Sequence, residues 1–273
     1  MVSVAVGLPR SEFREKLRIY AIDGALLGLF MLSACVSVVM LEHPASPARL
    51  AITSALSRRV IVAVAMGLTA AGLIYSPWGK RSGAFMNPAM VVCFVRLGKL
   101  SIGDACGYIG AQFAGSVGGV FVAAVALPGL VSQPAVNYVA TTPSGGPGPA
   151  FLVESCMAFV LISVVTAVNR SPRLAPFAGV FAAMLVALFI SVAAPISGMS
   201  INPARTFGSA LWAHSWSGFW IYLSAPLFGM LASTELQLRL VKRDSSRLCG
   251  KVNHDETIDC FVRCGCTKGT SHD

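Results

Sequence analysis

Charged residues are scarce in this chain, since Asp, Glu, Lys and Arg make up only 12% of its 273 residues. Soluble domains carry about 25% charged residues, so the shortage speaks against a soluble globular enzyme. Apolar residues reach 55%, and this abundance excludes an intrinsically disordered chain. Together the two proportions point to an integral membrane protein.

Sequence motifs typical of nucleotide binding and of catalysis are missing as well. No Gly-rich nucleotide-binding loop is present, so the sequence offers no ATP-binding site that could drive a pump. The apolar runs hold no cluster of His, Cys and Asp of the kind that a membrane enzyme would need. We therefore predict neither an enzyme nor a cofactor. The net charge of +9 does not indicate a nucleic acid partner, because the charges lie between the apolar runs.

Six apolar runs are long enough, or nearly so, to cross a membrane. A spanning helix needs about 20 mostly apolar residues, and lipid forces such a run to be helical. The runs are 19–41, 60–76, 105–127, 150–168, 174–194 and 217–234. An alternative for the first run is a lipoprotein signal cleaved before Cys35, but apolar residues continue beyond that cysteine. We predict an all-α membrane protein with six transmembrane helices.

Basic residues set the orientation, because Lys and Arg in short loops favour the cytoplasmic side. With the N-terminus inside, most Lys and Arg residues fall on the cytoplasmic side. Four basic residues remain for the outer side: Arg49, Arg58, Arg59 and Arg205. The adjacent pair among them, Arg58 and Arg59, runs against the rule. We expect both termini to be cytoplasmic.

The six runs divide into two halves that repeat one pattern. The first run of each half carries one acid, Asp23 or Glu154. After the second run of each half comes an Asn-Pro-Ala triplet that opens a short apolar run, 90–95 or 206–212. The triplets are Asn87, Pro88 and Ala89 in the first half and Asn202, Pro203 and Ala204 in the second.

An odd number of spans in each half makes the two halves point in opposite directions, as in the inverted repeats of many transport proteins. Asn is a preferred N-cap, and Pro is favoured at the first helical position. Each triplet therefore predicts the start of a half-helix that enters the membrane, and the two starts should meet near its centre. Secondary transporters with alternating access also use inverted repeats and broken helices, so this alternative stays open.

The paired motifs resemble those of the major intrinsic proteins, the aquaporin and glycerol-facilitator family. The resemblance covers about residues 18–238 and is strongest to bacterial aquaporin-like members. It rests on Ser-Gly-Ala-Phe-Met-Asn-Pro-Ala at 82–89 and Ser-Gly-Met-Ser-Ile-Asn-Pro-Ala-Arg at 197–205. It implies a six-helix bundle with two re-entrant half-helices, acting as a passive channel for water and small neutral solutes such as glycerol, hydrogen peroxide or ammonia. It also implies a homotetramer in the lipid of the bacterial inner membrane.

The division of the chain follows from the repeat. It comprises a cytoplasmic segment 1–18, a first repeat 19–127, an outer connection 128–149, a second repeat 150–238 and a cytoplasmic tail 239–273. Two Gly-x3-Gly pairs, Gly103 with Gly107 and Gly115 with Gly119, indicate close helix contacts in the third span.

The resemblance also assigns a selectivity constriction to Arg205, Met199 and Ile190. The fourth position falls on Met66 or Gly67, and we choose Met66. An Arg within a membrane segment is expected to be functional. Three apolar residues beside one Arg form a less polar ring than the strict water-channel pattern, which has His in place of Ile190. The range of solutes stays open.

Two further groups of residues allow alternative roles. Asp23 and Glu154 could relay protons, but their equivalent positions favour a structural role in which they accept N–H bonds from the re-entrant loops. The tail contains residues that weakly suggest a metal site: Cys249, His254, Cys260, Cys264 and Cys266. Paired zinc spacing is absent from this tail, so we expect an unstructured or docking segment rather than a metal centre.

Overall fold

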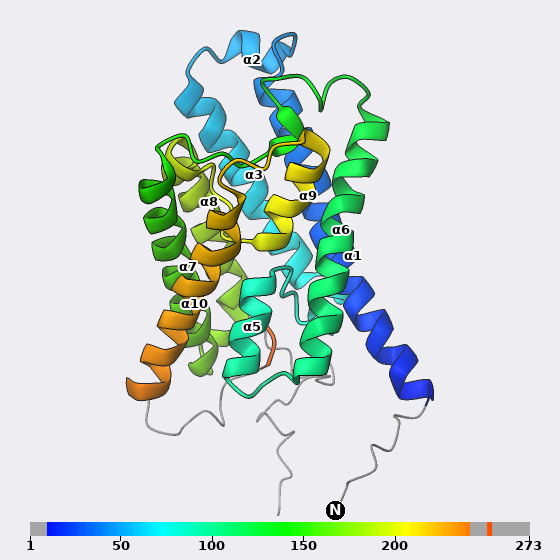
Figure 1. Cartoon of the computed structure of the whole chain (residues 1–273), viewed down its shortest axis with the longest axis vertical. Coiled ribbons are helices and arrows are strands. Elements are labelled where there is room, and N and C mark those ends of the chain that lie inside the picture. The colour runs from blue at the N-terminus through cyan, green and yellow to red at the C-terminus, as the bar shows by residue number, and fades with distance from the viewer. Residues whose placement is uncertain (1–9, 241–249, 253–273) are drawn as a thin grey trace, which may run out of the picture.

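The structure is a computed structural model that describes residues 10–240 and 250–252. All regular elements in these ranges are helices, and they stand side by side in one bundle (Figure 1). The six long helices are α1 (Arg10–Glu42), α3 (Ala55–Tyr75), α6 (Ile102–Ala126), α7 (Pro147–Arg170), α8 (Ala178–Ser197) and α10 (Phe219–Leu240). The short ones are α2 (Pro47–Ala51), α4 (Pro77–Ser82), α5 (Pro88–Arg96), α9 (Pro203–Ala213), η1 (Asn137–Val139) and η2 (Ala175–Phe177).

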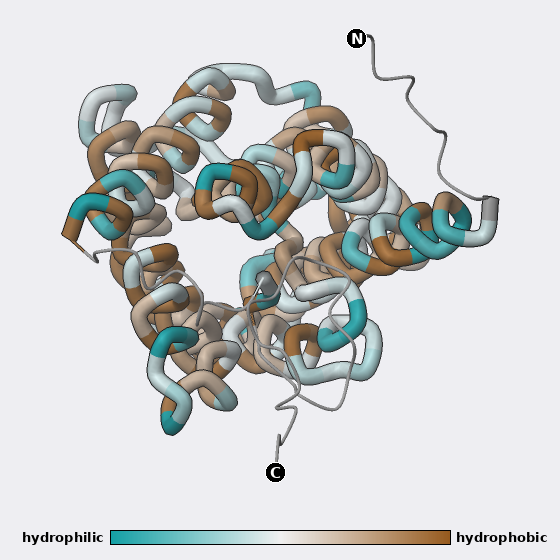
Figure 2. The backbone as a smooth tube through the Cα atoms, turned by 90° about the horizontal axis from the view of Figure 1, so that it is seen from below, coloured by the Kyte–Doolittle hydropathy of each residue, from teal (hydrophilic) through white to brown (hydrophobic). Residues whose placement is uncertain are grey.

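Each predicted span corresponds to one long helix, so the predicted all-α class with six long helices is confirmed. Within the described ranges, five helical segments are long and apolar enough to cross a membrane: Ser11–Glu42, Ala55–Tyr75, Ile102–Ala126, Pro147–Arg170 and Ala175–Ser197. The sixth helix, α10, has a similar length but is more polar, with Glu235 and Arg239 in its last turns. Seen from below, the helices form a ring whose walls are mostly white to brown (Figure 2).

The helix contacts are symmetric between the two halves. In the first half α1 packs on α6, and in the second α7 packs on α10 in the same way. The middle helices, α3 and α8, pack on each other across the halves. Each half-helix packs against the last helix of the other half, α5 on α10 and α9 on α6. Exchanging the halves therefore reproduces the same set of contacts, as an inverted repeat requires.

Glycines bring α1 and α6 into backbone contact. A Cβ atom at Gly115 would lie 1.9 Å from the carbonyl oxygen of Gly24, and one at Gly119 would lie 2.1 Å from that of Gly28. Small residues allow such close approach in membranes, where dispersion between helices replaces the hydrophobic effect. The Gly115 and Gly119 pair therefore serves a contact inside the chain.

A matched pair of alanine substitutions tests this contact. Gly115→Ala should lower the free energy of unfolding by about 1–3 kcal/mol, because the added methyl forces α1 and α6 apart. Gly118→Ala lies on the same helix, and its Cβ would meet nothing within 4 Å, so it should not lower stability, because Ala favours a helix over Gly. Thermal unfolding in detergent measures both variants. Equal melting temperatures for the two would contradict the close contact.

Candidate functional site

The two Asn-Pro-Ala triplets each start a half-helix. Asn87 is the N-cap of α5, and its Oδ1 accepts a hydrogen bond of 2.9 Å from the backbone N–H of Ala89. Asn202 is the N-cap of α9, and its Oδ1 accepts from Ala204 at 3.1 Å. Pro occupies the first helical position in both, where its missing N–H costs no hydrogen bond. The same local chemistry thus begins both helices.

The two starts lie against each other. The Nδ2 of Asn87 donates to the carbonyl of Ile201 at 2.8 Å, and the Nδ2 of Asn202 donates to the carbonyl of Met86 at 2.7 Å. Each accepting residue has a positive φ, +48° at Ile201 and +47° at Met86, although non-glycine residues rarely adopt such values. The two half-helices therefore meet tip to tip through reciprocal bonds. Each amide nitrogen keeps a second hydrogen that these bonds do not use.

Two buried carboxylates anchor the loops in front of the half-helices. Asp23 accepts from the backbone N–H groups of Phe85 and Met86, both at 2.9 Å. Glu154 accepts from the equivalent N–H groups of Ser200 at 2.9 Å and Ile201 at 2.5 Å. Lipid offers no partners to such groups, so the protein must supply them.

Further donors and acceptors complete the same arrangement. Gln112 donates to Asp23 at 2.7 Å, and the hydroxyl of Ser197 donates to Glu154 at 2.7 Å. Tyr108 donates to the carbonyl of Ser82, and Tyr222 donates to that of Ser197, again in equivalent positions. The sequence interpretation missed Gln112 and Tyr108. A polar residue within an otherwise apolar span was the available signal.

A cavity of about 450 Å³ runs past the meeting point of the half-helices. Asn87 and Asn202 line it, and so do all four residues chosen for the constriction: Met66, Ile190, Met199 and Arg205. Gly67, the alternative to Met66, lies against Ala183 and Ala187 of α8 instead. Among the residues that the structure describes, no hydrogen-bond partner is found for the buried Nη1 of Arg205. This guanidinium group thus retains a donor at the wall of the cavity.

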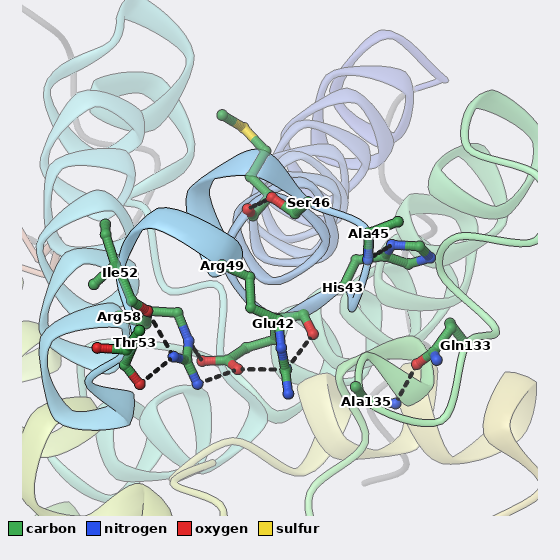
Figure 3. A network of polar contacts seen from close by, with 11 residues as sticks. Glu42, His43, Ala45, Ser46, Arg49, Ile52, Thr53, Arg58, Gln133 and Ala135 are labelled. Carbon is green, nitrogen blue, oxygen red and sulfur yellow. Dashed lines mark hydrogen bonds and ion pairs between the residues drawn. The ribbon is translucent and has the colours of Figure 1, made fainter.

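One end of the cavity, beside the connection between α1 and α3, carries an ionic network (Figure 3). Arg58 binds both carboxylate oxygens of Glu42 at 3.1 Å, and Arg49 binds one of them, also at 3.1 Å. Arg58 also donates to the carbonyls of Ile52 and Thr53. Arg58, which stands out in the sequence as an exception to the charge rule, thus holds the connection between α1 and α3 together.

Glu42 and Arg59 also line the cavity, at the end where this network lies. Neither residue was singled out from the sequence as part of the channel. At the opposite end, the lining includes Val252, which follows α10 by twelve residues in the chain.

The suggested metal ligands of the tail, Cys249, His254, Cys260, Cys264 and Cys266, lie outside the described residues. Within the described ranges, no three His, Cys, Asp or Glu side chains are grouped closely enough to hold a metal ion.

Comparisons with known proteins agree with this geometry. A family model described as "Major intrinsic protein" matches residues 22–235. A Nicotiana alata protein described as "Probable aquaporin NIP-type" is 32% identical over 197 residues, which cover 68% of this chain and 71% of that protein. An Oryza sativa subsp. japonica protein described as "Aquaporin NIP1-3" is 33% identical over 63% of this chain and 58% of its own length, so the chain spans less than two thirds of that relative.

One solved structure shows the same fold. It is described as the "X-ray structure of the aquaglyceroporin from Plasmodium falciparum". It matches with a TM-score of 0.68 at 18% identity and covers 83% of this chain and 97% of that one. At this identity the similarity supports the fold alone.

Proposed function

We propose, from the premise that this chain belongs to the major intrinsic protein family, that its pore conducts water and small neutral solutes and excludes ions and protons. The family consists of passive channels, so the chain is a membrane channel rather than an enzyme. One observation carries the proposal: two half-helix N-termini meet at a cavity, and each is capped by an Asn that lines it.

The meeting point disfavours cations. The N-terminus of a helix carries about half a positive elementary charge, so two of them raise the energy of any cation between them. Half-helix dipoles and an Arg are the established barrier of aquaporin-type pores. The unused amide hydrogens of Asn87 and Asn202 would donate to the oxygen of a passing water. A water held by two donors accepts no proton from its neighbour, which interrupts proton transfer along the file.

The constriction sets the range of solutes in this proposal. Met66, Ile190 and Met199 offer little hydrogen bonding, whereas Arg205 donates to an oxygen atom of the solute. A ring of this kind tolerates small neutral molecules that offer an acceptor atom to Arg205, such as glycerol, hydrogen peroxide or ammonia. An alternating-access transporter is less well supported, because Asp23 and Glu154 already accept the loop hydrogen bonds and are not free to bind a coupling ion.

The assembly and orientation are part of the proposal. The start of α1 and the end of α10 lie at the same end of the bundle (Figure 1), and the basic residues favour the cytoplasm for that end. We infer a bacterial inner membrane, from the resemblance to bacterial members, and a homotetramer, as in the family. The proposed repeats remain 19–127 and 150–238, joined by 128–149 and flanked by 1–18 and 239–273.

Stopped-flow light scattering of proteoliposomes tests conduction. The protein should speed osmotic shrinkage with a low activation energy and without dependence on an ion gradient. Met66→Trp should reduce both water and glycerol permeability at least about tenfold, equivalent to a barrier higher by about 1.4 kcal/mol, because the larger ring fills the cavity. Leu68→Trp is the control, since Leu68 is exposed on the outer face of α3. Shrinkage no faster than in empty vesicles, or equal effects of both variants, would contradict the proposal.

A further inference from the structure

A short segment after α10, Gly250–Val252, lies at the inner end of the cavity. Figure 1 draws it as a small orange-red piece beside α5, at the end of the bundle where α1 begins and α10 ends. Lys251 is 1% exposed and Val252 is 2% exposed, so the segment is enclosed by protein. Val252 belongs to the apolar cluster of Ile74, Phe85 and Leu161, and it lines the cavity together with them.

The segment is attached to both repeats. The backbone N–H of Val252 donates to the carbonyl of Gly83 at 3.0 Å, in the loop that precedes α5. The carbonyl of Val252 accepts from the Nδ2 of Asn169 at 3.0 Å, near the end of α7. Val252 therefore bridges the first repeat and the second repeat across the inner end of the pore.

Asn169 is a receptor for this segment rather than a lipid-facing residue. Its side chain is 4% exposed although it lies one residue before the end of α7. Its Nδ2 donates to Val252, and its buried Oδ1 has no hydrogen-bond partner within the described part of the chain. A buried amide that lacks one of its partners is costly, so its placement at this mouth needs a reason other than packing.

The outer end of the pore provides a comparison. Gly198, the equivalent of Gly83, is covered by Thr141 and Thr142 of the connection between α6 and α7. That connection is joined to a spanning helix on each side. Gly83 lies against the side chains of Phe85 and of Lys251, a residue of the segment that follows α10. The cover of Gly198 therefore comes from a connection between two long helices, whereas part of the cover of Gly83 comes from the segment that follows α10.

We propose that the inner mouth is a docking site for Gly250–Val252 and that Val252 acts as a plug that slows conduction while it is docked. This inference rests on the proposed function, because it assumes that the cavity is the conducting path. Asn169 is the positioning residue, and the side chain of Val252 is the obstruction. The bonds to Gly83 and Asn169 and the burial of the Val252 side chain contribute to holding the segment in place.

Variants of the full chain in proteoliposomes test the plug. Val252→Gly removes the obstructing side chain, and Asn169→Asp removes the donor while keeping the size of the receptor. Both should raise water permeability, by roughly tenfold for Val252→Gly if docking of one buried valine limits the flux. Val160→Ala, an exposed position on the same helix as Asn169, should not change it. Equal water permeability of the wild type and the three variants would overturn the plug but leave the proposed channel function intact.

Docking is also measured without conduction. Hydrogen–deuterium exchange of the Val252 amide should be slow in the wild type, because that amide donates to Gly83, and fast in Asn169→Asp. Fast exchange in the wild type would overturn the docking site even if no protein conducted water, and absent conduction alone would count against the proposed function. A monodisperse gel-filtration peak for each variant separates these results from misfolding.

Discussion

Replacing Arg205 with Ala should open the channel to larger solutes and weaken its exclusion of charge. Glycerol permeability should rise at least about tenfold, which corresponds to a barrier lower by about 1.4 kcal/mol. The variant removes the longest polar side chain of the constriction and a fixed positive charge from the cavity wall. Proteoliposomes with an internal pH dye measure the proton leak, and stopped-flow scattering measures glycerol entry.

Two further variants separate the size of Arg205 from its charge. Arg205→Lys keeps the charge, so it should preserve proton exclusion while it partly relaxes solute selection. Arg239→Ala removes an Arg from an exposed position at the far end of α10 and should change neither property. Unaltered glycerol and proton permeability in Arg205→Ala would contradict the assignment of Arg205 to the constriction.

Features encoded by local chemistry were predictable from the sequence. Asn is a favoured N-cap and Pro a favoured first helical residue, and two copies of this pair in equivalent loops predicted both α5 and α9. The length and apolarity of the runs predicted the six long helices, because a chain that spans lipid must satisfy its backbone hydrogen bonds within a helix. The predicted fold class and channel class are confirmed by the family match.

Features that depend on register or on distant contacts were not predictable. Met66 and Gly67 are adjacent, so the sequence left open which of them faces the cavity, and only the packing of α3 against α8 distinguishes them. Arg58 looked like an exception to the charge rule, because its partner Glu42 lies sixteen residues away across a turn. The contact between Val252 and Asn169 joins residues 83 positions apart, with no local pattern to mark it.

The role of the two buried acids was predictable from the sequence only in part. Their equivalent positions were visible in the sequence, and that symmetry predicted a structural role for Asp23 and Glu154. The sequence did not show that each carboxylate would serve two consecutive backbone N–H groups, nor that Gln112 would add a donor to Asp23. These bonds hold the loops in the left-handed conformations at Met86 and Ile201, and so they position the carbonyls that join the two half-helices.

Replacing Glu154 with Ala should therefore cost most of the stability of the fold. The substitution leaves three buried donors without an acceptor: the N–H groups of Ser200 and Ile201 and the hydroxyl of Ser197. Each unsatisfied buried group costs about 1–3 kcal/mol, so the total of about 3–9 kcal/mol is a large part of the typical stability of a protein. Thermal unfolding in detergent and the yield of monodisperse protein measure the loss.

A graded series identifies the cause of that loss. Glu154→Gln keeps one acceptor oxygen, but its amide nitrogen places two hydrogens near the N–H donors of the loop. Its melting temperature should therefore lie between those of Glu154→Ala and the wild type. Glu235→Ala removes a carboxylate of the same type that pairs with Arg96 at the exposed end of α10, where an ion pair contributes at most about 1 kcal/mol. If Glu154→Ala melted no lower than Glu235→Ala, the re-entrant loop would not depend on this acid, and the reciprocal bonds between the half-helices would have to hold the loop unaided.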